Sequence, residues 1–273
     1  MSSPAALIAN ARMYSVAPGA VAAWKRLFQH LIEETGVPLT VIDHAFPAKL
    51  DDLWRRDDLA CTFMCGWPWL RLGLGHQVIA APIPRAAYAR GEAVYCSHFV
   101  VHKDSAFNTL EDTFGHRFAF TIDDSHSGYN APRHHLLSHR KDGQPLYREI
   151  VGPLTTPRRV LEAIAEGRAD VGPQDSFAFD LMARHAPELT RAVRVIASTG
   201  VMPMPALMAS RGIDAAIVAR LGDALVALAD DPAQGPLLDD LCIRGFARID
   251  PASYQLSERW ALAAEQRGLV RIT

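Results

Sequence analysis

Two serines that flank a histidine have the clearest potential for chemistry in this sequence. Ser125, His126 and Ser127 follow an apolar run at residues 117–122, and Gly-Tyr-Asn-Ala-Pro comes directly after them. An apolar run, a Ser/Gly turn and then a proline predict that a helix begins close to the serines. The first N–H groups of a helix lack partners and carry the positive end of the helix dipole. Serine hydroxyls beside such groups can bind an anion.

A simpler role for these serines is to cap the helix, because serine is a favoured N-cap residue. Asp124 precedes the turn, and aspartate is a favoured N-cap residue too. If its carboxylate points into the turn, it disfavours a doubly charged anion there. A ligand with one negative charge, or with an amine as well, then suits the turn. The sequence leaves capping and anion binding both open.

Alternating strands and helices are expected to position this turn. Strands are predicted at residues 6–13, 39–42, 59–65, 78–81, 97–102, 117–122, 169–172 and 193–198. Helices are predicted at residues 18–35, 48–55, 109–114, 158–166, 176–184, 215–230, 235–242 and 256–268, and a turn at 66–69. Strands that alternate with helices imply a parallel sheet. No linker interrupts the pattern, so two lobes would have to be joined by strands that cross between them.

The composition narrows the class of protein. The chain has 273 residues, of which 49% are hydrophobic and 21% charged, so we expect a folded globular core. Its formal net charge of -2 gives no basic field that would favour nucleic acid or an anionic membrane as a partner. The four cysteines lack the paired spacing of a zinc site, and we expect them to be free and mostly buried.

Two further signals carry less weight. His135 and His139 would share one face of a helix, but no further side chain at ligand spacing completes a zinc site. We therefore predict no metal and no cofactor. Trp67 follows a predicted strand end, where it could line a ligand pocket, although packing in the core is the commoner role of tryptophan.

Residues 117–133 resemble the signature of the phosphate/phosphite/phosphonate ABC-transporter substrate-binding protein family. The resemblance lies in Arg-Phe-Ala-Phe-Thr followed by Ser-His-Ser-Gly-Tyr-Asn-Ala-Pro-Arg. Segments similar to other family motifs occur at residues 95–105, 161–176 and 201–205, in the same order along the chain as in the family. Each motif is weak alone, but together they extend over nearly the whole chain.

The resemblance implies a fold and a function. The fold is α/β, of the two-lobed type II periplasmic-binding-protein-like class, with a mainly parallel sheet flanked by helices in each lobe and a ligand cleft between the lobes. Residues 1–95 with 200–273 would form lobe I, and residues 96–199 lobe II. The implied function is to bind a small oxyanion-bearing ligand for ABC transport, without catalysis, by closure of the lobes. Its partners would be that anionic or zwitterionic ligand and a transporter permease.

The resemblance also implies ligand-binding residues. Ser125 and Ser127 match the family's oxyanion turn, and Tyr95 and Asp175 match a pocket tyrosine and a ligand-facing aspartate. His126 replaces a threonine of that turn, and its backbone N–H could still bind the ligand. The remaining candidates differ from the family or lie beside its motifs: Thr156, where the family has a histidine nearby, Phe46, which stands near a second pocket tyrosine, and Trp67.

The sequence alone leaves more than one cellular location and more than one activity open. The first residues show no basic segment followed by an apolar run, so no secretory signal is expected there. The family is periplasmic, but a cytoplasmic protein fits this start as well. An enzyme of the kind found in menaquinone- or thiamine-precursor pathways, or a ligand sensor, could use the same fold. His126 beside Asp124 would then be the candidate acid/base group.

Overall fold

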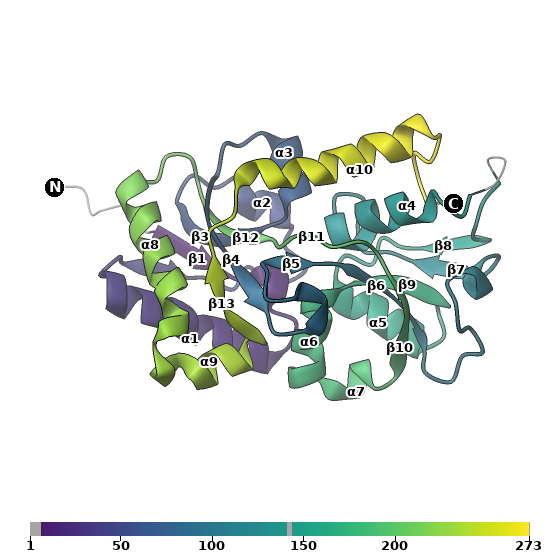
Figure 1. Cartoon of the computed structure of the whole chain (residues 1–273), viewed down its shortest axis with the longest axis horizontal. Helices are drawn as coiled ribbons and strands as arrows, with labels where there is room; N and C mark the ends of the chain where they lie inside the picture. The colour runs from purple at the N-terminus through teal and green to yellow at the C-terminus, as the bar shows by residue number, and fades with distance from the viewer. Residues whose placement is uncertain (1–6, 141–143, 273) are drawn as a thin grey trace. The chain divides into compact units, whose positions relative to one another are not determined.

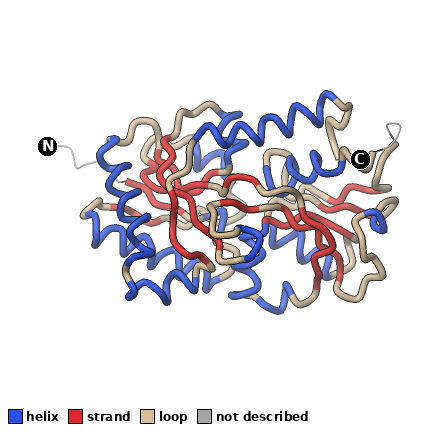
Figure 2. The backbone as a smooth tube through the Cα atoms, viewed as in Figure 1, coloured by secondary structure: helices blue, strands red, loops and turns tan. Residues whose placement is uncertain are grey.

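The computed structural model describes residues 7–140 and 144–272, and the chain divides into two compact units. Unit 1 comprises Met1–Val94 and Pro203–Ser253, and unit 2 comprises Tyr95–Met202 and Tyr254–Thr273. The chain therefore passes from one unit to the other three times. Figure 2 shows that the strands in each unit lie among helices.

Unit 1 is built on a six-stranded sheet with the order β13-β4-β12-β3-β1-β2 (Figure 1). Its strands are β1 (Leu7–Asn10), β2 (Leu39–Val41), β3 (Leu59–Met64), β4 (Gln77–Pro84), β12 (Ala206–Ala209) and β13 (Ile243–Ala247). Its α-helices are α1 (Pro18–Thr35), α2 (Leu50–Trp54), α3 (Gly66–Leu72), α8 (Ala215–Ala227) and α9 (Gly235–Asp240). Strand β1 pairs in parallel with β2 and β3, whereas β12 and β13 pair antiparallel with their neighbours.

Helix α1 is an element of this unit whose start, end and buried face follow from its sequence. Pro18 occupies its first turn, where a missing N–H costs no hydrogen bond. Gly36 ends it in the left-handed conformation, with a φ of 65°, and its N–H donates to the Ile32 carbonyl. Trp24 and Leu27 recur at helical spacing on the buried face, so burial of that face holds the helix on the sheet.

Unit 2 is built on a five-stranded sheet with the order β10-β6-β9-β7-β8 (Figure 1). Its strands are β6 (Ser97–His102), β7 (Arg117–Ala119), β8 (Glu149–Val151), β9 (Val171–Asp175) and β10 (Val193–Ser198). Its helices are the π-helix η4 (His126–Asn130) and the α-helices α4 (Ala131–Leu136), α5 (Pro157–Ala165), α6 (Ser176–His185), α7 (Pro187–Thr190) and α10 (Gln255–Gln266). Strand β7 pairs in parallel with β8 and β9, and β6 pairs antiparallel with β9 and β10. Strands β5 (Val94–Tyr95) and β11 (Met202–Pro203), at the unit boundary, form a two-stranded sheet.

The two faces of the unit 2 sheet have different partners. Phe118 and Val171 lie on one face, in a core that includes Leu136 of α4 and Ala264 of α10. Gly172 lies on the other face, where a Cβ atom would contact Val160 of α5. Helices therefore cover both faces of a largely buried sheet, as in other α/β proteins with parallel strands.

The observed elements correct several predictions. Residues 66–69 were expected to form a turn, but they begin α3, because Pro68 is accommodated in a first helical turn. Strands β8, β12 and β13 were missed. All three are short, and Gly245 in β13 and Pro205 beside β12 are residues that disfavour strands. The strand predicted at 169–172 is shifted to Val171–Asp175, which makes Asp175 its last residue. Residue 6, the first of the strand predicted at 6–13, lies outside the described residues.

The last segment of the chain also differs from the prediction. Residues 200–273 were assigned to the first lobe as one block, but Tyr254–Thr273 belongs to unit 2. The physical reason is apolar packing, since Ala264, Leu269 and Ile272 are buried in the core that contains Phe118. Sequence periodicity predicted the helix there but carried no information about which sheet it covers.

Candidate functional site

Three helices of unit 2 begin at one edge of its sheet. Strands β7, β8 and β9 are mutually parallel, and η4, α5 and α6 follow them. Ser125, Thr156 and Asp175 are the N-cap residues of these helices, and each side chain accepts a backbone hydrogen bond. We call these three residues, Ser127 and the first N–H groups of the three helices the capped edge. The helix dipoles place partial positive charge there, at the carboxyl ends of the strands where α/β proteins bind ligands.

The capping role that the sequence left open is present in the structure. Ser125 Oγ accepts a hydrogen bond from the Gly128 N–H at 2.9 Å, and Thr156 Oγ1 accepts one from the Arg159 N–H at 3.3 Å. A hydroxyl that accepts one hydrogen bond can still donate its own proton. Capping and anion binding are therefore compatible at both residues.

Ser127 and Asp175 are joined in the interior of unit 2. Ser127 Oγ donates to Asp175 Oδ2 at 3.1 Å, while Asp175 Oδ1 accepts from the N–H groups of Phe177 and Ala178 at 3.0 Å. Ser97 Oγ donates to the Ser127 carbonyl at 2.7 Å and fixes the turn against β6. Burial of the carboxyl group raises the pKa of Asp175 to about 6, although its hydrogen bonds act in the opposite direction.

Gly128 allows the turn to pack closely against Thr121, in the segment that follows β7. A Cβ atom at this position would overlap the Thr121 hydroxyl and come within 2.9 Å of Ser125 Oγ. Thr121 Oγ1 is buried and has no hydrogen-bond partner among residues 7–140 and 144–272. The glycine of the predicted motif is therefore required by close approach, not by an unusual backbone conformation.

His126 contributes its backbone to the turn, but its ring packs elsewhere. The side chain is 3% exposed, its Nδ1 atom lies 3.0 Å from Asn130 Nδ2, and it stacks on Trp260 of α10. Burial, and to a smaller extent His134, lowers the pKa of His126 to about 3. The ring is therefore neutral at ordinary pH.

Tyr95 is buried in β5, close to the start of α6. The next residue, Cys96, exchanges hydrogen bonds with Ser176: its N–H donates to Ser176 Oγ at 3.1 Å, and its carbonyl accepts from the Ser176 N–H at 3.0 Å. Tyr95 thus stands one residue from the segment that holds α6, the helix capped by Asp175.

The other two predicted residues belong to unit 1. Phe46 is 45% exposed, and Trp67 is buried in α3 with the Arg71 guanidinium 5.0 Å from its ring centroid. Arg12, which was not among the predicted residues, follows β1 and donates from Nε to the His44 carbonyl at 3.0 Å. Burial lowers the pKa of Arg12. An isolated arginine after a strand has no spacing signal that would have identified it.

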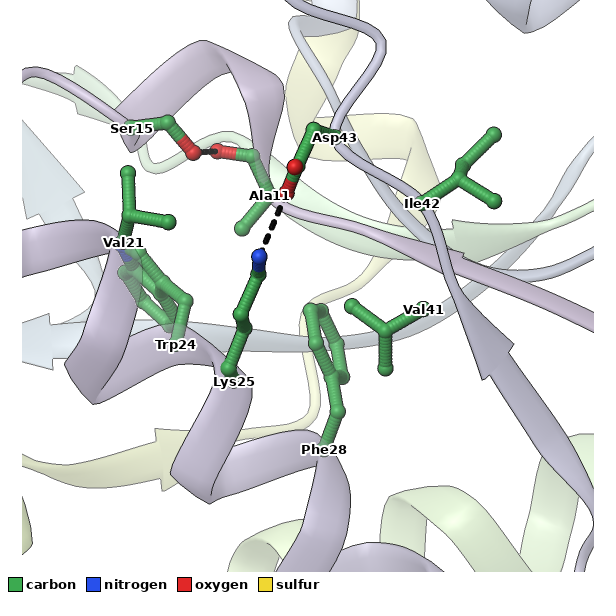
Figure 3. Close-up of a pocket in the computed structure, with 9 residues that line it drawn as sticks. All are labelled: Ala11, Ser15, Val21, Trp24, Lys25, Phe28, Val41, Ile42 and Asp43. Atoms are coloured by element: carbon green, nitrogen blue, oxygen red, sulfur yellow. Dashed lines mark hydrogen bonds and ion pairs between the residues drawn. The ribbon is translucent and has the colours of Figure 1, made fainter.

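A hollow in unit 1 lies beside α1 and the end of β2 (Figure 3). It is lined by Ala11, Ser15, Val21, Trp24, Lys25, Phe28, Val41, Ile42 and Asp43. Lys25 Nζ and Asp43 form an ion pair at 2.8 Å, and Ser15 Oγ donates to the Ala11 carbonyl at 2.9 Å. These polar groups are already paired with one another, and the rest of the lining is apolar. The one cation of this lining, Lys25, is thus already paired with a carboxylate, which disfavours an oxyanion there.

Metal binding finds no support in the described part of the chain, where no group of three or more potential ligands occurs. The rings of His135 and His139 are 5.8 Å apart, and His139 Nδ1 lies 3.2 Å from Glu111.

Among the described residues, no helix is long and apolar enough to cross a membrane. None of the four cysteines, all of which lie among the described residues, forms a disulfide; Cys61, Cys65 and Cys96 are buried, and Cys242 is half-buried.

A family model matches most of the chain. Residues 17–254 match the family described as "ABC transporter, phosphonate, periplasmic substrate-binding protein". A search of curated proteins gives no match.

Solved structures resemble the chain over nearly its whole length. A binding protein component of an ABC phosphonate transporter from Pseudomonas aeruginosa is 17% identical, with a TM-score of 0.80 over 96% of this chain and 88% of that one. PhnD1 from Prochlorococcus marinus in complex with methylphosphonate is 16% identical, with a TM-score of 0.78 over 97% of this chain and 100% of that one. The periplasmic aliphatic sulphonate binding protein SsuA from Escherichia coli is 17% identical, with a TM-score of 0.60 over 98% and 89%. These similarities confirm the predicted α/β fold of two-lobed periplasmic binding proteins.

Proposed function

Because the chain belongs to the family of periplasmic substrate-binding proteins of phosphonate ABC transporters, we propose that its capped edge binds the oxyanion of the transported ligand. The observation that carries the proposal is the meeting of three helix starts, each with a side-chain cap, at one edge of the unit 2 sheet. The dipoles of the three helix starts favour a negative charge, and N–H groups of η4 and α5 are the backbone donors proposed for it, since the first N–H groups of α6 already donate to Cys96 and Asp175. Ser125 Oγ would add a donor to the same charge, and so would Ser127 Oγ when a protonated Asp175 donates to it and frees its proton. PhnD1, with methylphosphonate bound, gives the chemical class to test first.

The charge of the ligand would depend on Asp175. Its carboxylate is buried and hydrogen-bonded to Ser127, one of the two turn serines. Two unit charges 4 Å apart interact by about 4 kcal/mol at an effective dielectric constant of 20. A fully ionised anion beside an ionised Asp175 would lose affinity by a comparable amount. We therefore propose that the site binds a singly charged oxyanion, with one proton shared between the ligand and Asp175.

This proposal predicts a pH dependence that differs between two probes. Methanesulfonate carries one negative charge and no proton, so it should bind only while Asp175 is protonated. Because burial raises the pKa of Asp175 to about 6, affinity for methanesulfonate should fall up to tenfold per pH unit above pH 6. Methylphosphonate has an acidic proton of its own to donate, and its affinity should fall less. Titration calorimetry from pH 5 to pH 8 measures both.

Asp175→Asn should remove the pH dependence for methanesulfonate. The asparagine keeps an oxygen that can accept from Phe177 and Ala178, so α6 retains its cap. Asp112→Asn is the matched control, because Asp112 accepts backbone hydrogen bonds in unit 2 but lies outside the capped edge. If Asp175→Asn retained the wild-type pH profile, Asp175 would not be the titrating group, and the shared-proton proposal would be wrong.

The same pKa shift has a consequence for stability. The folded-state pKa of Asp175 lies above the ordinary aspartate value of 3.8, so the folded state binds its proton more tightly than the unfolded state does. The contribution of Asp175 to stability is therefore greatest below about pH 4 and is lost as the pH rises through about 6. The difference amounts to about 3 kcal/mol. In the absence of ligand, Asp175→Asn should gain stability relative to the wild type between pH 5 and pH 8.

We further propose that the chain binds its ligand without converting it. His126 was the candidate acid/base group, but a pKa of about 3 leaves it neutral and too weak a base near pH 7. Its ring also packs on α10, with Nδ1 bound to Asn130.

Family membership further supports a transporter permease as the partner and the periplasm as the location. Phe46, Trp67 and Arg12 are the candidates for ligand contacts in unit 1.

A ligand screen tests the proposed function. Melting temperature should rise with methylphosphonate, phosphate or methanesulfonate but not with neutral or cationic compounds of the same size. A ligand at 100 times its dissociation constant adds about 2.7 kcal/mol of stability. If phosphonates, phosphate, sulfonates and carboxylates all left the melting temperature unchanged, oxyanion binding would be excluded.

A further inference from the structure

Helix α10 holds the predicted ligand turn through the side chain of His126. The ring of Trp260 stacks on the His126 ring, with centroids 5.7 Å apart and planes inclined by 28°. The backbone of His126 lies between Ser125 and Ser127, the two serines of the turn. A contact with α10 therefore acts directly on the segment that carries the proposed oxyanion donors.

Hydrogen bonds fix the orientation of the same ring. Arg133 can only donate, so the amide oxygen of Asn130 faces its Nη2 atom, at 3.2 Å. The Asn130 amide nitrogen then donates to the Ser257 carbonyl at 2.8 Å and to His126 Nδ1 at 3.0 Å. Because Nδ1 accepts, the neutral ring carries its proton on Nε2. Asn130 thus connects the turn and α10 through polar contacts, in addition to the stacking of Trp260.

A second connection runs from the start of α4 to the end of the chain. Arg133 is 4% exposed, and its Nη1 atom donates to the Val270 carbonyl at 2.7 Å. Its guanidinium also lies 5.7 Å from the centroid of the Tyr129 ring. Helix α4 continues directly from η4, so the tail after α10 is bound to the same continuous helical segment as the turn.

We propose that Trp260 and Asn130 are positioning residues, through which α10 keeps the ligand turn in its binding conformation. The inference rests on the proposed function of the capped edge. Neither residue needs to touch the ligand. Affinity should nevertheless depend on both, because the N–H groups and hydroxyls of the turn must already point to one position. By linkage, a ligand that binds the ordered turn stabilises the docking of α10 by the same factor.

Hydrogen exchange on the full chain tests the positioning role without any ligand. Trp260→Ala should raise the exchange of amides 126–130 at least threefold, while exchange in β9 stays at the wild-type rate. Trp260→Phe retains a stacking ring and should restore slow exchange. His134→Ala is the matched control, because the His134 ring also stacks on Trp260, at 4.9 Å and 3°, but lies outside the turn. It should change the exchange of the turn by less than twofold.

Affinity measurements connect this effect to function. With methylphosphonate and inorganic phosphate as probes, Trp260→Ala should weaken binding about tenfold and Trp260→Phe less than threefold. In the wild type, saturating probe should slow exchange in residues 255–266, and Trp260→Ala should lose that protection. Asn130→Ala breaks the polar connection while Trp260 stays in place, so it provides a second test if the alanine variant of Trp260 does not fold.

The outcomes separate the inference from the proposed function. Wild-type exchange of the turn in both Trp260→Ala and Asn130→Ala would show that the turn keeps its conformation without α10, and the inference would be wrong. Faster exchange with unchanged affinity would also overturn it. If the wild-type protein bound neither anion, the proposed function would fail instead. The exchange comparison would still decide whether α10 orders the turn.

Discussion

Replacing Gly128 with alanine should abolish anion binding while most of the fold survives. A Cβ atom would overlap the Thr121 hydroxyl and press on Ser125 Oγ, so the turn would have to move away from Thr121. Overpacking of this kind costs about 1–3 kcal/mol of stability. The loss in binding should be larger, at least a hundredfold, because all N–H groups of the turn would shift together. Titration with methylphosphonate, alongside the melting temperature, gives both quantities.

Gly200→Ala is the control for this prediction. Gly200 also lies in unit 2, but its Cβ atom would meet only the Trp260 ring, at an ordinary contact distance of 3.9 Å. Binding and melting temperature should stay close to the wild-type values. If Gly128→Ala bound methylphosphonate as tightly as Gly200→Ala does, the turn would not be the anion site.

The second large effect is expected when both turn serines are replaced. Ser125→Ala with Ser127→Ala removes two hydroxyls that would donate to a charged oxygen, each worth about 1.5–3 kcal/mol. The lost cap of η4 costs stability by about 1 kcal/mol. Affinity for methylphosphonate should therefore fall at least tenfold and more than stability does. Calorimetry and a thermal melt of the same variant measure the two changes.

Asp214→Ala provides the comparison for the cap. Asp214 caps α8 in unit 1 by accepting from the Ala216 N–H at 2.8 Å, and it has no part in the capped edge. Asp214→Ala should lower the melting temperature about as much as loss of the Ser125 cap does. It should leave the affinity for methylphosphonate unchanged. Wild-type affinity in the double serine variant, with a lowered melting temperature, would mean that the serines only cap the helix.

The sequence predicted the elements whose local signals agree with their tertiary setting. Helix α1 has Pro18 at its start and Gly36 at its end, and the structure gives Pro18–Thr35. The turn at Ser125 was predicted from an apolar strand, two serines and Pro132, and η4 begins directly after Ser125. Capping residues and prolines act within one turn of a helix, so a single sequence is enough to detect them.

The remaining errors come from long-range packing. Strand β12, Ala-Leu-Met-Ala, is fully buried between β3 and β4, so it lacks the alternation that would have identified it. Helix α10 was predicted, but its place in unit 2 depends on contacts that it and the residues after it make with η4 and α4, more than a hundred residues earlier. A further contact comes from His126, which the sequence presented as a ligand contact. Its ring instead stacks on Trp260, a partner that no local pattern indicates.

The most direct test of the account is to locate the ligand on the protein by nuclear magnetic resonance. Amide shifts of the labelled wild-type chain would be followed during titration with methylphosphonate at pH 6. The proposed site predicts the largest shifts within unit 2 at residues 126–128, 158–159 and 176–178, where η4, α5 and α6 begin. Saturable shifts that left these three helix starts unchanged and clustered elsewhere, such as around the hollow beside Lys25 and Asp43, would contradict it.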